Sequence, residues 1–385
     1  MTDRPPSDAM DSSATRSRRD PSLDDGLQRD VYCVAGLPID AIDMAGAVDK
    51  VRRAAHTRTR CIIATPNLNF LMSAQTDPEF RASVLRSDLC LADGMPLIWV
   101  ARLLALPIPE RVAGSELFDR LLAHEGRPVT VYFFGGPPGA AAAACSKLQR
   151  SGGGLLCVGY EEVPFAPVEA LSSDDMIERI NQSGAEFVIV SLGARKGQAW
   201  IERNRDRICA PVICHLGAVV NFAAGTVSRA PRSMQALGLE WLWRIKEEPA
   251  LWRRYAKDGL AFVALLRKHV LPHAWRLRFR SSERTKPPTL RVDSQGERTR
   301  LVLSGTWTRS DLAPLRTALI AAAQAGAKVQ VSLDDVEGGD SAFVALLMLA
   351  TGSRQLSVSV TSTSDGANRV LQDWRAEFLL GTAAA

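Results

Sequence analysis

The sequence predicts an α/β protein with a mostly parallel, Rossmann-like sheet that carries helices on both faces, followed by a small C-terminal α/β domain. Two observations support this prediction. From residue 31 onward, short apolar runs typical of buried strands alternate with longer segments of helical periodicity, and this alternation is typical of a parallel sheet. The chain has 385 residues, 46% of them hydrophobic, which is enough for two or three domains with buried cores.

The first elements belong to the larger domain. Residues 1–28 are rich in Ser, Asp, Arg and Pro and lack periodicity, so we expect a disordered N-terminal arm. Residues 29–240 are expected to form the main α/β domain. Its strands are expected at residues 60–65, 89–92, 129–134, 155–160, 187–192 and 212–216. Its helices are expected at residues 69–85, 96–104 and 140–149.

A second unit follows a break in the apolar pattern. Residues 281–288 end in two prolines and are interpreted as a linker. Residues 289–381 are then sufficient for a small α/β domain. Its strands are expected at residues 290–292, 299–303, 329–333 and 356–361, and its helices at residues 312–325 and 342–351.

The basic residues are unevenly distributed along the chain. The net charge is +5, and residues 241–286 hold 12 Lys and Arg against 4 Asp and Glu. The same segment holds Trp241, Trp243, Trp252 and Trp275, four of the eight tryptophans. This pattern is typical of contact with a membrane surface or another polyanion, although a solvated basic face with packed tryptophans would share it. We interpret residues 241–280 as a membrane-docking appendage and expect no nucleic-acid partner.

Cysteine usage and apolar segments restrict the class of protein. The seven cysteines form no Cys-x-x-Cys pair, and several lie in apolar runs, which indicates a reducing compartment and no structural zinc. No ligand cluster predicts a metal, and no cofactor is expected. The N-terminus lacks the apolar core of a signal peptide, and no apolar stretch reaches the roughly 18 residues of a spanning helix. We therefore expect a soluble or peripheral protein.

Asp93 is the first candidate catalytic residue. It follows the apolar run 89–92 and precedes Gly94, so it should lie where a buried strand ends. In open α/β sheets the carboxyl ends of the strands face the ligand crevice, where a carboxylate can accept a proton from a substrate hydroxyl or hold a sugar. A lone Asp-Gly pair is more often only a turn, so the interpretation depends on its neighbours.

Four further clusters are expected at strand ends of the same domain. They supply hydroxyl and amide groups, two cations, and glycine loops whose backbone N–H groups can approach a phosphate. The clusters are Thr65 with Asn67 and Asn69, Gly135 with Gly136, Arg195 with Lys196 in a glycine loop at 192–198, and Gly217 with Asn221. His215 lies in an apolar run and is expected to be a core residue. Together the clusters describe a crevice suited to transfer from a nucleotide-activated donor.

The ordered motifs resemble those of the bacterial WecG/TagA/CpsF glycosyltransferases, glycosyltransferase family 26. The resemblance covers roughly residues 30–270, and its most specific motif is Gly-Thr-Val-Ser-Arg-Ala-Pro at residues 225–231. The other matching segments are residues 65–67, 93–96, 110–114, 133–136, 217–222, 238–244, 248–249 and 253–255.

The resemblance implies a reaction and a location. The reaction is inverting transfer of a sugar, N-acetylmannosamine-like or another hexose, from a UDP-sugar to a polyprenyl-diphosphate-linked saccharide. The pathway class is bacterial surface polysaccharide or exopolysaccharide synthesis, at the cytoplasmic, inner face of the membrane. Asp93 is implied to be the general base. Cations are implied to stabilise the leaving UDP, and the candidates are Arg111, Lys196, Arg229 and Arg244, with Glu240 as a nucleoside-binding residue and Gln198 as a further substrate contact.

The chain departs from the family in one loop. Where the family usually has Gly-x-Pro-Lys-Gln-Glu-x-x-Trp, residues 193–200 are Gly-Ala-Arg-Lys-Gly-Gln-Ala-Trp. Gly197 and Gln198 thus replace the family's Gln and Glu. A different sugar would account for this change, and so would a non-catalytic regulatory or scaffold protein. A dinucleotide-dependent oxidoreductase is a third hypothesis, but the chain lacks the glycine fingerprint of that class.

Residues 289–381 resemble a STAS domain, the fold of anti-sigma factor antagonists. The resemblance rests on residues 303–305 and on the run 329–334, which is followed by Asp340-Ser341. In that family the pattern is Asp-Ser-x-Gly and the serine is phosphorylated. Here Ala342-Phe343 follows Ser341, so a phosphorylation switch is not expected, and the resemblance implies interaction with a protein partner.

Overall fold

The α/β architecture expected from the sequence is confirmed. The computed structural model describes residues 26–225, 230–231, 234, 239–247, 249–279 and 286–381. Six strands form one sheet in the order β4-β3-β8-β7-β5-β6, and every neighbouring pair is parallel. These strands are β3 (Cys61–Ala64), β4 (Leu89–Cys90), β5 (Val129–Gly135), β6 (Leu155–Glu161), β7 (Phe187–Ser191) and β8 (Val212–His215).

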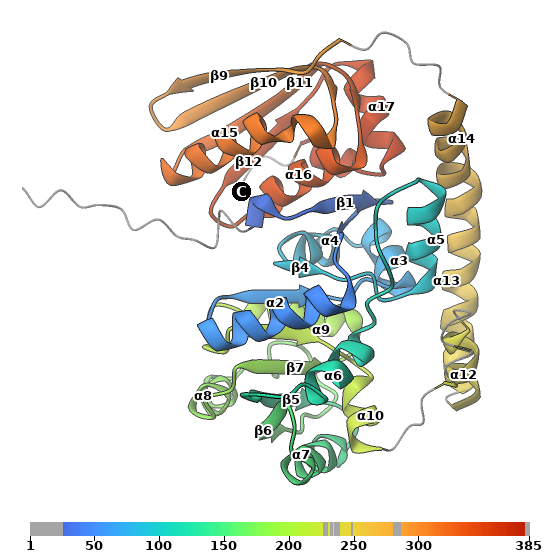
Figure 1. Cartoon of the computed structure of the whole chain (residues 1–385), viewed down its shortest axis with the longest axis vertical. Coiled ribbons are helices and arrows are strands. Elements are labelled where there is room, and N and C mark those ends of the chain that lie inside the picture. The colour runs from blue at the N-terminus through green and yellow to red at the C-terminus, as the bar shows by residue number, and fades with distance from the viewer. Residues whose placement is uncertain are drawn as a thin grey trace, which may run out of the picture.

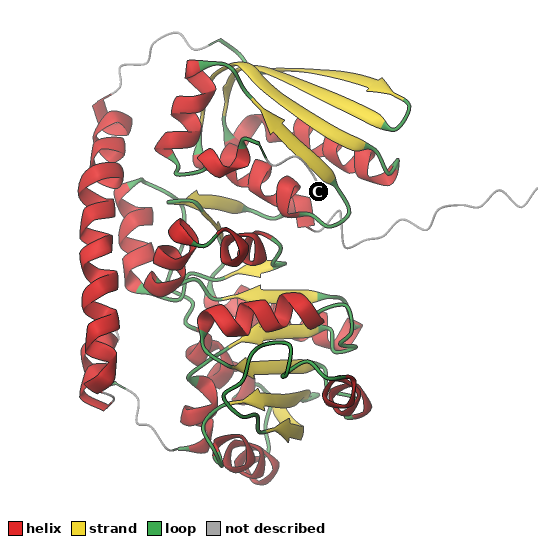
Figure 2. Cartoon of the chain, turned by 180° about the vertical axis from the view of Figure 1, so that it is seen from behind, coloured by secondary structure: helices red, strands yellow, loops and turns green. Residues whose placement is uncertain are grey.

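Helices cover both faces of this sheet (Figure 2). Successive side chains of a strand point to opposite faces, so Ile62 and Ile63 lie in two different cores. Ile62 packs with α8 (Asp174–Gln182) and α9 (Ala194–Asn204). On the other face, Ile63 packs with four helices, α2 (Met44–Thr57), α6 (Gly114–Leu122), α7 (Ala140–Ser151) and α10 (Val219–Ala224).

A separate antiparallel hairpin precedes the sheet. It consists of β1 (Val31–Val34) and β2 (Leu37–Asp40), and all eight strand residues are buried. The disordered arm was expected to end at residue 28. Residues 26–28 instead form a helical turn, and Leu27 is buried in the core.

Two expected elements differ from the structure for local reasons. The single helix expected at 69–85 is two helices, α3 (Leu68–Thr76) and α4 (Pro78–Leu85). Asp77 caps α4 by accepting the Phe80 N–H at 3.0 Å, and Pro78 occupies the first turn, where its missing N–H costs nothing. The glycine loop expected at 192–198 is mostly the first turn of α9. As expected, a helix follows Asp93-Gly94, namely α5 (Met95–Leu103).

The cysteines do not all remain thiols. Cys145 on α7 and Cys157 on β6 form a disulfide, because α7 packs along the edge strand β6. The reducing compartment inferred from the absence of Cys-x-x-Cys is therefore not supported by the structure. The five other cysteines are free, and Cys33, Cys61, Cys90 and Cys214 among them are buried.

A long helical segment connects the two units. It contains α12 (Glu240–Glu247), a 3₁₀ turn at Pro249–Leu251, α13 (Trp252–Leu265), a π-helical turn at Leu266–Val270 and α14 (Leu271–Phe279). We call residues 240–279 the helical rod. It runs beside the six-stranded sheet domain and reaches the C-terminal unit (Figure 1). Among the described residues, no helix is long and apolar enough to cross a membrane.

The C-terminal unit is a small α/β domain, as expected. Its four-stranded mixed sheet has the order β12-β11-β10-β9, in which only β9 is antiparallel to its neighbour. The strands are β9 (Thr289–Gln295), β10 (Arg298–Trp307), β11 (Lys328–Gly339) and β12 (Ser357–Thr361). The helices are α15 (Leu312–Gln324), α16 (Ser341–Gly352) and α17 (Asp365–Asp373).

The C-terminal unit packs against the hairpin through α16. Eleven of its twelve residues are buried, and one hydrophobic core includes both α16 and the hairpin. Ser341 at its start is 2% exposed, and its hydroxyl donates to the carbonyl of Cys33 at 3.0 Å. Near its end, a Cβ at Gly352 would lie 2.4 Å from the carbonyl oxygen of Leu85. The face that carries Ser341 is therefore covered within this chain.

Candidate active site

Asp93 lies at the carboxyl edge of the six-stranded sheet. Its backbone N–H donates to the carbonyl of Pro66 at 2.8 Å, which joins the loop after β4 to the loop after β3. The side chain is half-buried. Gly94 follows it, and a Cβ at Gly94 would lie 3.4 Å from the Cβ of Asn67. Asp93 therefore occupies the wall of the sheet edge where ligands bind in open α/β folds.

The surroundings of Asp93 change its acidity. Burial raises the pKa of Asp93 to about 7, while the guanidinium of Arg111, the N–H of Gly114 and the guanidinium of Arg244 each oppose that rise. The carboxylate of Glu240 adds to it. A carboxylate with a pKa near neutrality can take up a proton at physiological pH, which is what a general base requires.

Gly114 contributes to the pKa of Asp93, a role that the sequence analysis did not predict. It is the first residue of α6, so its N–H has no acceptor within the helix and can donate to the carboxylate of Asp93. A Cβ at this position would lie 2.4 Å from Leu216 and 3.7 Å from the Oδ2 of Asp93. Only glycine lets the start of α6 approach the loop after β8 this closely, and the signal for it was the Ala113-Gly114 pair before an amphipathic helix.

Arg111 connects this edge to the helical rod. Its Nη1 lies 2.8 Å from Oε2 of Glu240 on α12, and the Arg111 side chain is 14% exposed. Arg244, one turn further along α12, has its guanidinium carbon 5.8 Å from the ring centre of Phe222. Asp93, Arg111, Glu240 and Arg244 are therefore brought together although they span more than 150 residues of sequence.

Three polar residues after β3 have structural partners. Thr65 is buried, and its hydroxyl donates to the carbonyl of His215 at 3.4 Å. Asn67 caps α3 by accepting the Phe70 N–H at 3.2 Å. Asn69 donates to Asp258 of α13 at 3.0 Å, which fastens the rod next to the loop that contacts Asp93. Each of these three side chains therefore has a hydrogen-bond partner within the protein, and the partner of Asn69 lies on the rod.

The glycine loop after β5 forms a tight turn, as expected. The start of the helix that follows it binds a carboxylate of the protein. Gly135 and Gly136 both have positive φ, and a Cβ at Gly136 would lie 2.9 Å from Val220. The N–H of Gly139, at the start of α7, donates to the carboxylate of Glu162 at 2.9 Å. A protein carboxylate thus already occupies part of this helix N-terminus, where a phosphate was expected.

Lys196 and Gln198 are not directed at Asp93. The Lys196 ammonium donates to the carbonyl of Ala166 at 2.9 Å and lies 3.9 Å from the ring centre of Phe165. Gln198 is 2% exposed, on the buried side of α9. Asn221 is half-buried on α10. Arg229 lies outside the described residues.

Gly197 is explained by His215. A Cβ at Gly197 would lie only 2.2 Å from the Cδ2 of His215, so the imidazole occupies the space that any side chain at 197 would need. Burial lowers the pKa of His215 to about 4, which keeps the ring neutral. The imidazole at the end of β8 therefore gives a packing reason for glycine at position 197.

We expect Gly197→Ala to lower the free energy of unfolding by about 1–3 kcal/mol, the usual range for overpacking. His215→Ala should remove the collision, so the double variant should lose less stability than the two single changes added together. Urea denaturation of the four proteins measures this coupling. Gly259→Ala on α13, where a Cβ has no neighbour within 4 Å, is the matched control. Additive losses would contradict the packing explanation.

Comparison with known proteins agrees with this geometry. The sequence profile described as "Glycosyl transferase WecG/TagA/CpsF family" matches residues 32–276, which include the whole six-stranded sheet and most of the rod. The chain belongs to this family. Members of the WecG/TagA/CpsF family are glycosyltransferases of cell-surface polysaccharide synthesis, so the protein is a transferase of that class.

The rest of the chain has a second match. A profile described as "Mlab, STAS domain" matches residues 290–377, so this WecG/TagA/CpsF protein carries a C-terminal STAS domain. Among solved structures, the crystal structure of the SsGBP and GDP complex is 12% identical and covers 65% of this chain and 98% of that chain, with a TM-score of 0.20. A mutation variant of SsGBP is 11% identical, with 66% and 88% covered and the same TM-score of 0.20. At this score neither likeness supports an argument.

The donor set at the site does not suggest a metal. Within the part of the chain that the structure describes, no group of three or more His, Cys, Asp and Glu side chains could hold a metal ion. Among the described residues, the charged groups that act on each other around Asp93 are two guanidinium groups and two carboxylates, and one of each is already joined in the Arg111–Glu240 pair. Such a set can bind an anion and move one proton.

Proposed function

We propose that the protein is an inverting glycosyltransferase that moves a hexose from a UDP-sugar to a polyprenyl-diphosphate-linked saccharide, with Asp93 as the general base. The observation that carries the proposal is the position of Asp93, at the carboxyl edge of the sheet, with a pKa raised to about 7 and two guanidinium groups beside it. A group of this kind is half ionised at neutral pH and can accept a proton as an acceptor hydroxyl attacks.

The proposed step moves one proton and one glycosyl group. The acceptor hydroxyl oxygen attacks the anomeric carbon from the face opposite UDP, and Asp93 takes the hydroxyl proton. The bond between the anomeric carbon and the diphosphate oxygen breaks, and UDP leaves with that electron pair. Cations at the same edge would stabilise the charge that develops on the diphosphate. Arg244 is the better candidate of the two described guanidinium groups, because Arg111 is already paired with Glu240.

The width of the sheet edge supports an extended donor. β4 and β5 are separated by β3, β8 and β7, so four steps of about 4.8 Å place the Asp93 and Gly135 loops about 19 Å apart. A nucleotide-sugar could lie along these strand ends with its sugar near Asp93. Because Glu162 occupies the start of α7, the diphosphate is expected closer to Arg244 than to the Gly135-Gly136 loop.

The helical rod supports a lipid-linked acceptor. Large apolar side chains are exposed along it, and α5 adds two next to the rod. On the rod they are Trp241, Leu242, Trp252, Leu260, Val263, Leu271, Trp275, Leu277 and Phe279, and on α5 they are Trp99 and Leu103. Exposed tryptophans and leucines among Lys and Arg are typical of a helix that lies in a membrane interface. The Asn69–Asp258 and Arg111–Glu240 contacts hold this surface next to Asp93.

The purified full chain should release UDP from one of a panel of UDP-sugars when vesicles contain a polyprenyl-diphosphate-linked saccharide. UDP release is measured by a coupled assay, and the lipid product by mass spectrometry, with acceptor-free vesicles as the control. If no UDP-sugar binds in calorimetry and none is consumed, the proposal is wrong. The remaining candidate would then be a non-catalytic scaffold, whose one supporting feature, the Gly197-Gln198 loop, has a packing explanation at Gly197.

A further inference from the structure

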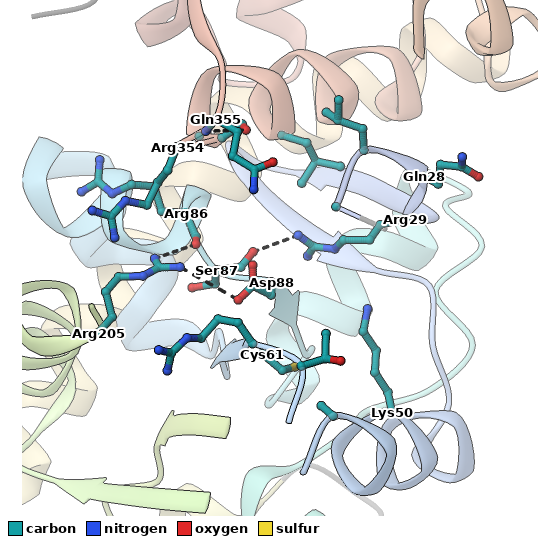
Figure 3. Close-up of a pocket in the computed structure, with 18 of the residues that line it drawn as sticks. Gln28, Arg29, Lys50, Cys61, Arg86, Ser87, Asp88, Arg205, Arg354 and Gln355 are labelled. Carbon is teal, nitrogen blue, oxygen red and sulfur yellow. Dashed lines mark hydrogen bonds and ion pairs between the residues drawn. The ribbon is translucent and has the colours of Figure 1, made fainter. Parts of the chain in front are cut away.

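A cavity lies at the edge of the six-stranded sheet opposite to Asp93. Its volume is about 690 Å³, and its walls include Cys61, the first residue of β3, and Asp88, which directly precedes β4 (Figure 3). The end of α16 and the loop after it close the cavity from the C-terminal unit, and α2 closes it from the other side. The length of a strand therefore separates the cavity from the candidate active site.

The lining of the cavity is strongly basic. Seven Lys and Arg side chains line it, against the two carboxylates of Asp88 and Asp206. Some of the cations have acidic partners. Arg29 binds both oxygens of Asp40, at 3.0 and 2.6 Å, and Arg354 lies 2.6 Å from Asp206.

The basic side chains beside these pairs are also near acidic groups. Arg86 lies 2.7 Å from Glu202. Arg205 lies 3.6 Å from Glu202 and 3.9 Å from Asp88, so it shares both carboxylates. Each of these four guanidinium groups thus has a carboxylate as an ion-pair partner. Three further cations line the cavity.

Those three cations are Lys50 and Arg53 on α2, and Arg60 before β3. Within the described chain, we find no carboxylate in ion-pair contact with any of them. Arg60 donates only to the neutral carbonyls of Ala210 and Ile208, at 2.6 and 2.8 Å. Burial and then the neighbouring Arg205 lower the pKa of Arg60, while the carboxylates of Asp88 and Asp206 oppose that change. Cations that outnumber carboxylates along a hollow concentrate anions there.

We propose that this cavity binds an organic molecule that carries two or more phosphate groups and has about the size of a nucleotide, at a site separate from the transferase crevice. Phosphate oxygens match the donors of Arg and Lys. The volume lies within the range of small-molecule sites, and a single phosphate would leave most of it empty. The walls also include Leu27, Ile42, Leu85 and Leu349, which can cover the uncharged part of such a molecule.

Binding would join the two units of the chain. Lys50 and Arg60 belong to the sheet domain, whereas Leu349 and Arg354 belong to the C-terminal unit. In the close-up, Lys50 and Arg354 lie on opposite sides of the cavity (Figure 3). A ligand that contacts both sets stabilises their association by mass action. The proposed consequence is that a phosphorylated metabolite sets how firmly the STAS domain is held against the transferase domain.

The test is calorimetry of the full chain with ATP and with pyrophosphate, and with inorganic phosphate as the arm with a single anion. We expect ATP and pyrophosphate to bind, and inorganic phosphate to bind at least tenfold more weakly. The Lys50→Glu/Arg53→Glu variant should weaken ATP binding at least tenfold. Arg150→Glu/Lys328→Glu makes the same change in net charge at exposed positions away from the cavity, and it should bind as the wild type does.

Binding in the transferase crevice is distinguished by Arg244→Ala, which removes the cation proposed to hold a diphosphate there and should leave affinity at the cavity unchanged. Three results would overturn the proposal: no binding of either ligand, loss of binding only in Arg244→Ala, or equal affinity in Lys50→Glu/Arg53→Glu and the wild type. If the charge reversal prevents folding, Lys50→Ala/Arg53→Ala replaces it under the same criteria. None of these results depends on sugar transfer, so the proposed function stands or falls separately.

Discussion

Asp93→Asn is expected to reduce the turnover number for sugar transfer by about 10²–10⁴-fold, the usual contribution of a positioned general base. The substitution keeps the size of the side chain and its backbone contact with Pro66, so the fold should persist. Affinity for the UDP-sugar should change little, because the proposed role is to take a proton rather than to bind the donor. Initial rates, with donor binding measured separately by calorimetry, give the two quantities.

The pH dependence follows from the raised pKa. Asp93 acts as a base only when ionised, so the wild-type rate should rise with pH and level off above the pKa of about 7. Asp93→Asn should lose this rise. A rate that falls as pH passes from 6 to 8 would contradict the assignment, because it would require the protonated form.

Stability should change in the opposite sense to activity. The folded pKa of about 7 lies above that of an unfolded aspartate, about 3.9. The native state is therefore favoured by a protonated Asp93 below about pH 4, and this contribution is lost as pH rises through 7. Asp93→Asn should raise the melting temperature at pH 8 and leave it nearly unchanged at pH 4. Asp335→Asn, at an exposed position on β11, is the control that should alter neither rate nor melting.

The sequence predicted the strands of the sheet better than the structure around them. The strands beginning at Cys61, Phe187 and Val212 are continuous apolar runs bounded by turn residues, and burial on both faces requires that composition. The hairpin from Val31 to Asp40 was not predicted as such. Its strand residues other than Asp40 are apolar, and α16, from the far end of the chain, covers it. No local pattern carries that information.

The candidate site, like the fold, could be predicted only in part from the sequence. Asp93 could be chosen from its motif and its place after an apolar run. Its acidity could not, because it depends on burial and on Arg111, Gly114 and Glu240, which come from two other segments of the chain. Lys196 was a reasonable candidate as a cation in a glycine-rich run, yet it binds the carbonyl of Ala166. Which way a side chain points is decided by packing, and spacing does not reveal it.

The disulfide could not be predicted from the sequence for a related reason. Cys145 and Cys157 are 12 residues apart and belong to no recognised spacing, so nothing in the sequence paired them. Their pairing depends on α7 returning along β6, which is a consequence of the parallel topology. Gly197 was singled out from the sequence alone, and the position of His215 gives glycine at this position a packing reason.

The second large effect is expected on membrane binding. Trp252→Ser, Leu260→Ser and Trp275→Ser together should weaken binding to anionic vesicles by about 10³-fold. These side chains are 54%, 74% and 66% exposed on the helical rod. Moving a large apolar side chain out of water contributes about 1.5–3 kcal/mol when it is complete, so three partial contributions add to about 4 kcal/mol, and each 1.4 kcal/mol is tenfold in affinity. Vesicle co-sedimentation measures the change.

The fold should tolerate this triple change, because the rod is held by other residues. Its inner side buries Phe262, Leu265 and Val270. Its far end is fixed by His273, whose ring meets Trp374 edge-on at 4.6 Å, and by the ion pair of Arg276 with Asp373. Circular dichroism and thermal melting should therefore match the wild type. Leu156→Ser/Val292→Ser, at exposed apolar positions away from the rod, should leave vesicle binding intact.

Activity distinguishes docking from a defect in chemistry. With an acceptor embedded in vesicles, the triple variant should lose most of its turnover, because the acceptor no longer reaches Asp93. With a short-chain, water-soluble acceptor, its rate should equal that of the wild type, since the Asn69–Asp258 and Arg111–Glu240 contacts that hold the rod beside the site remain. Equal losses with both acceptors would mean that the rod serves the crevice rather than the membrane. Unchanged vesicle binding would mean that these exposed side chains are not the docking surface.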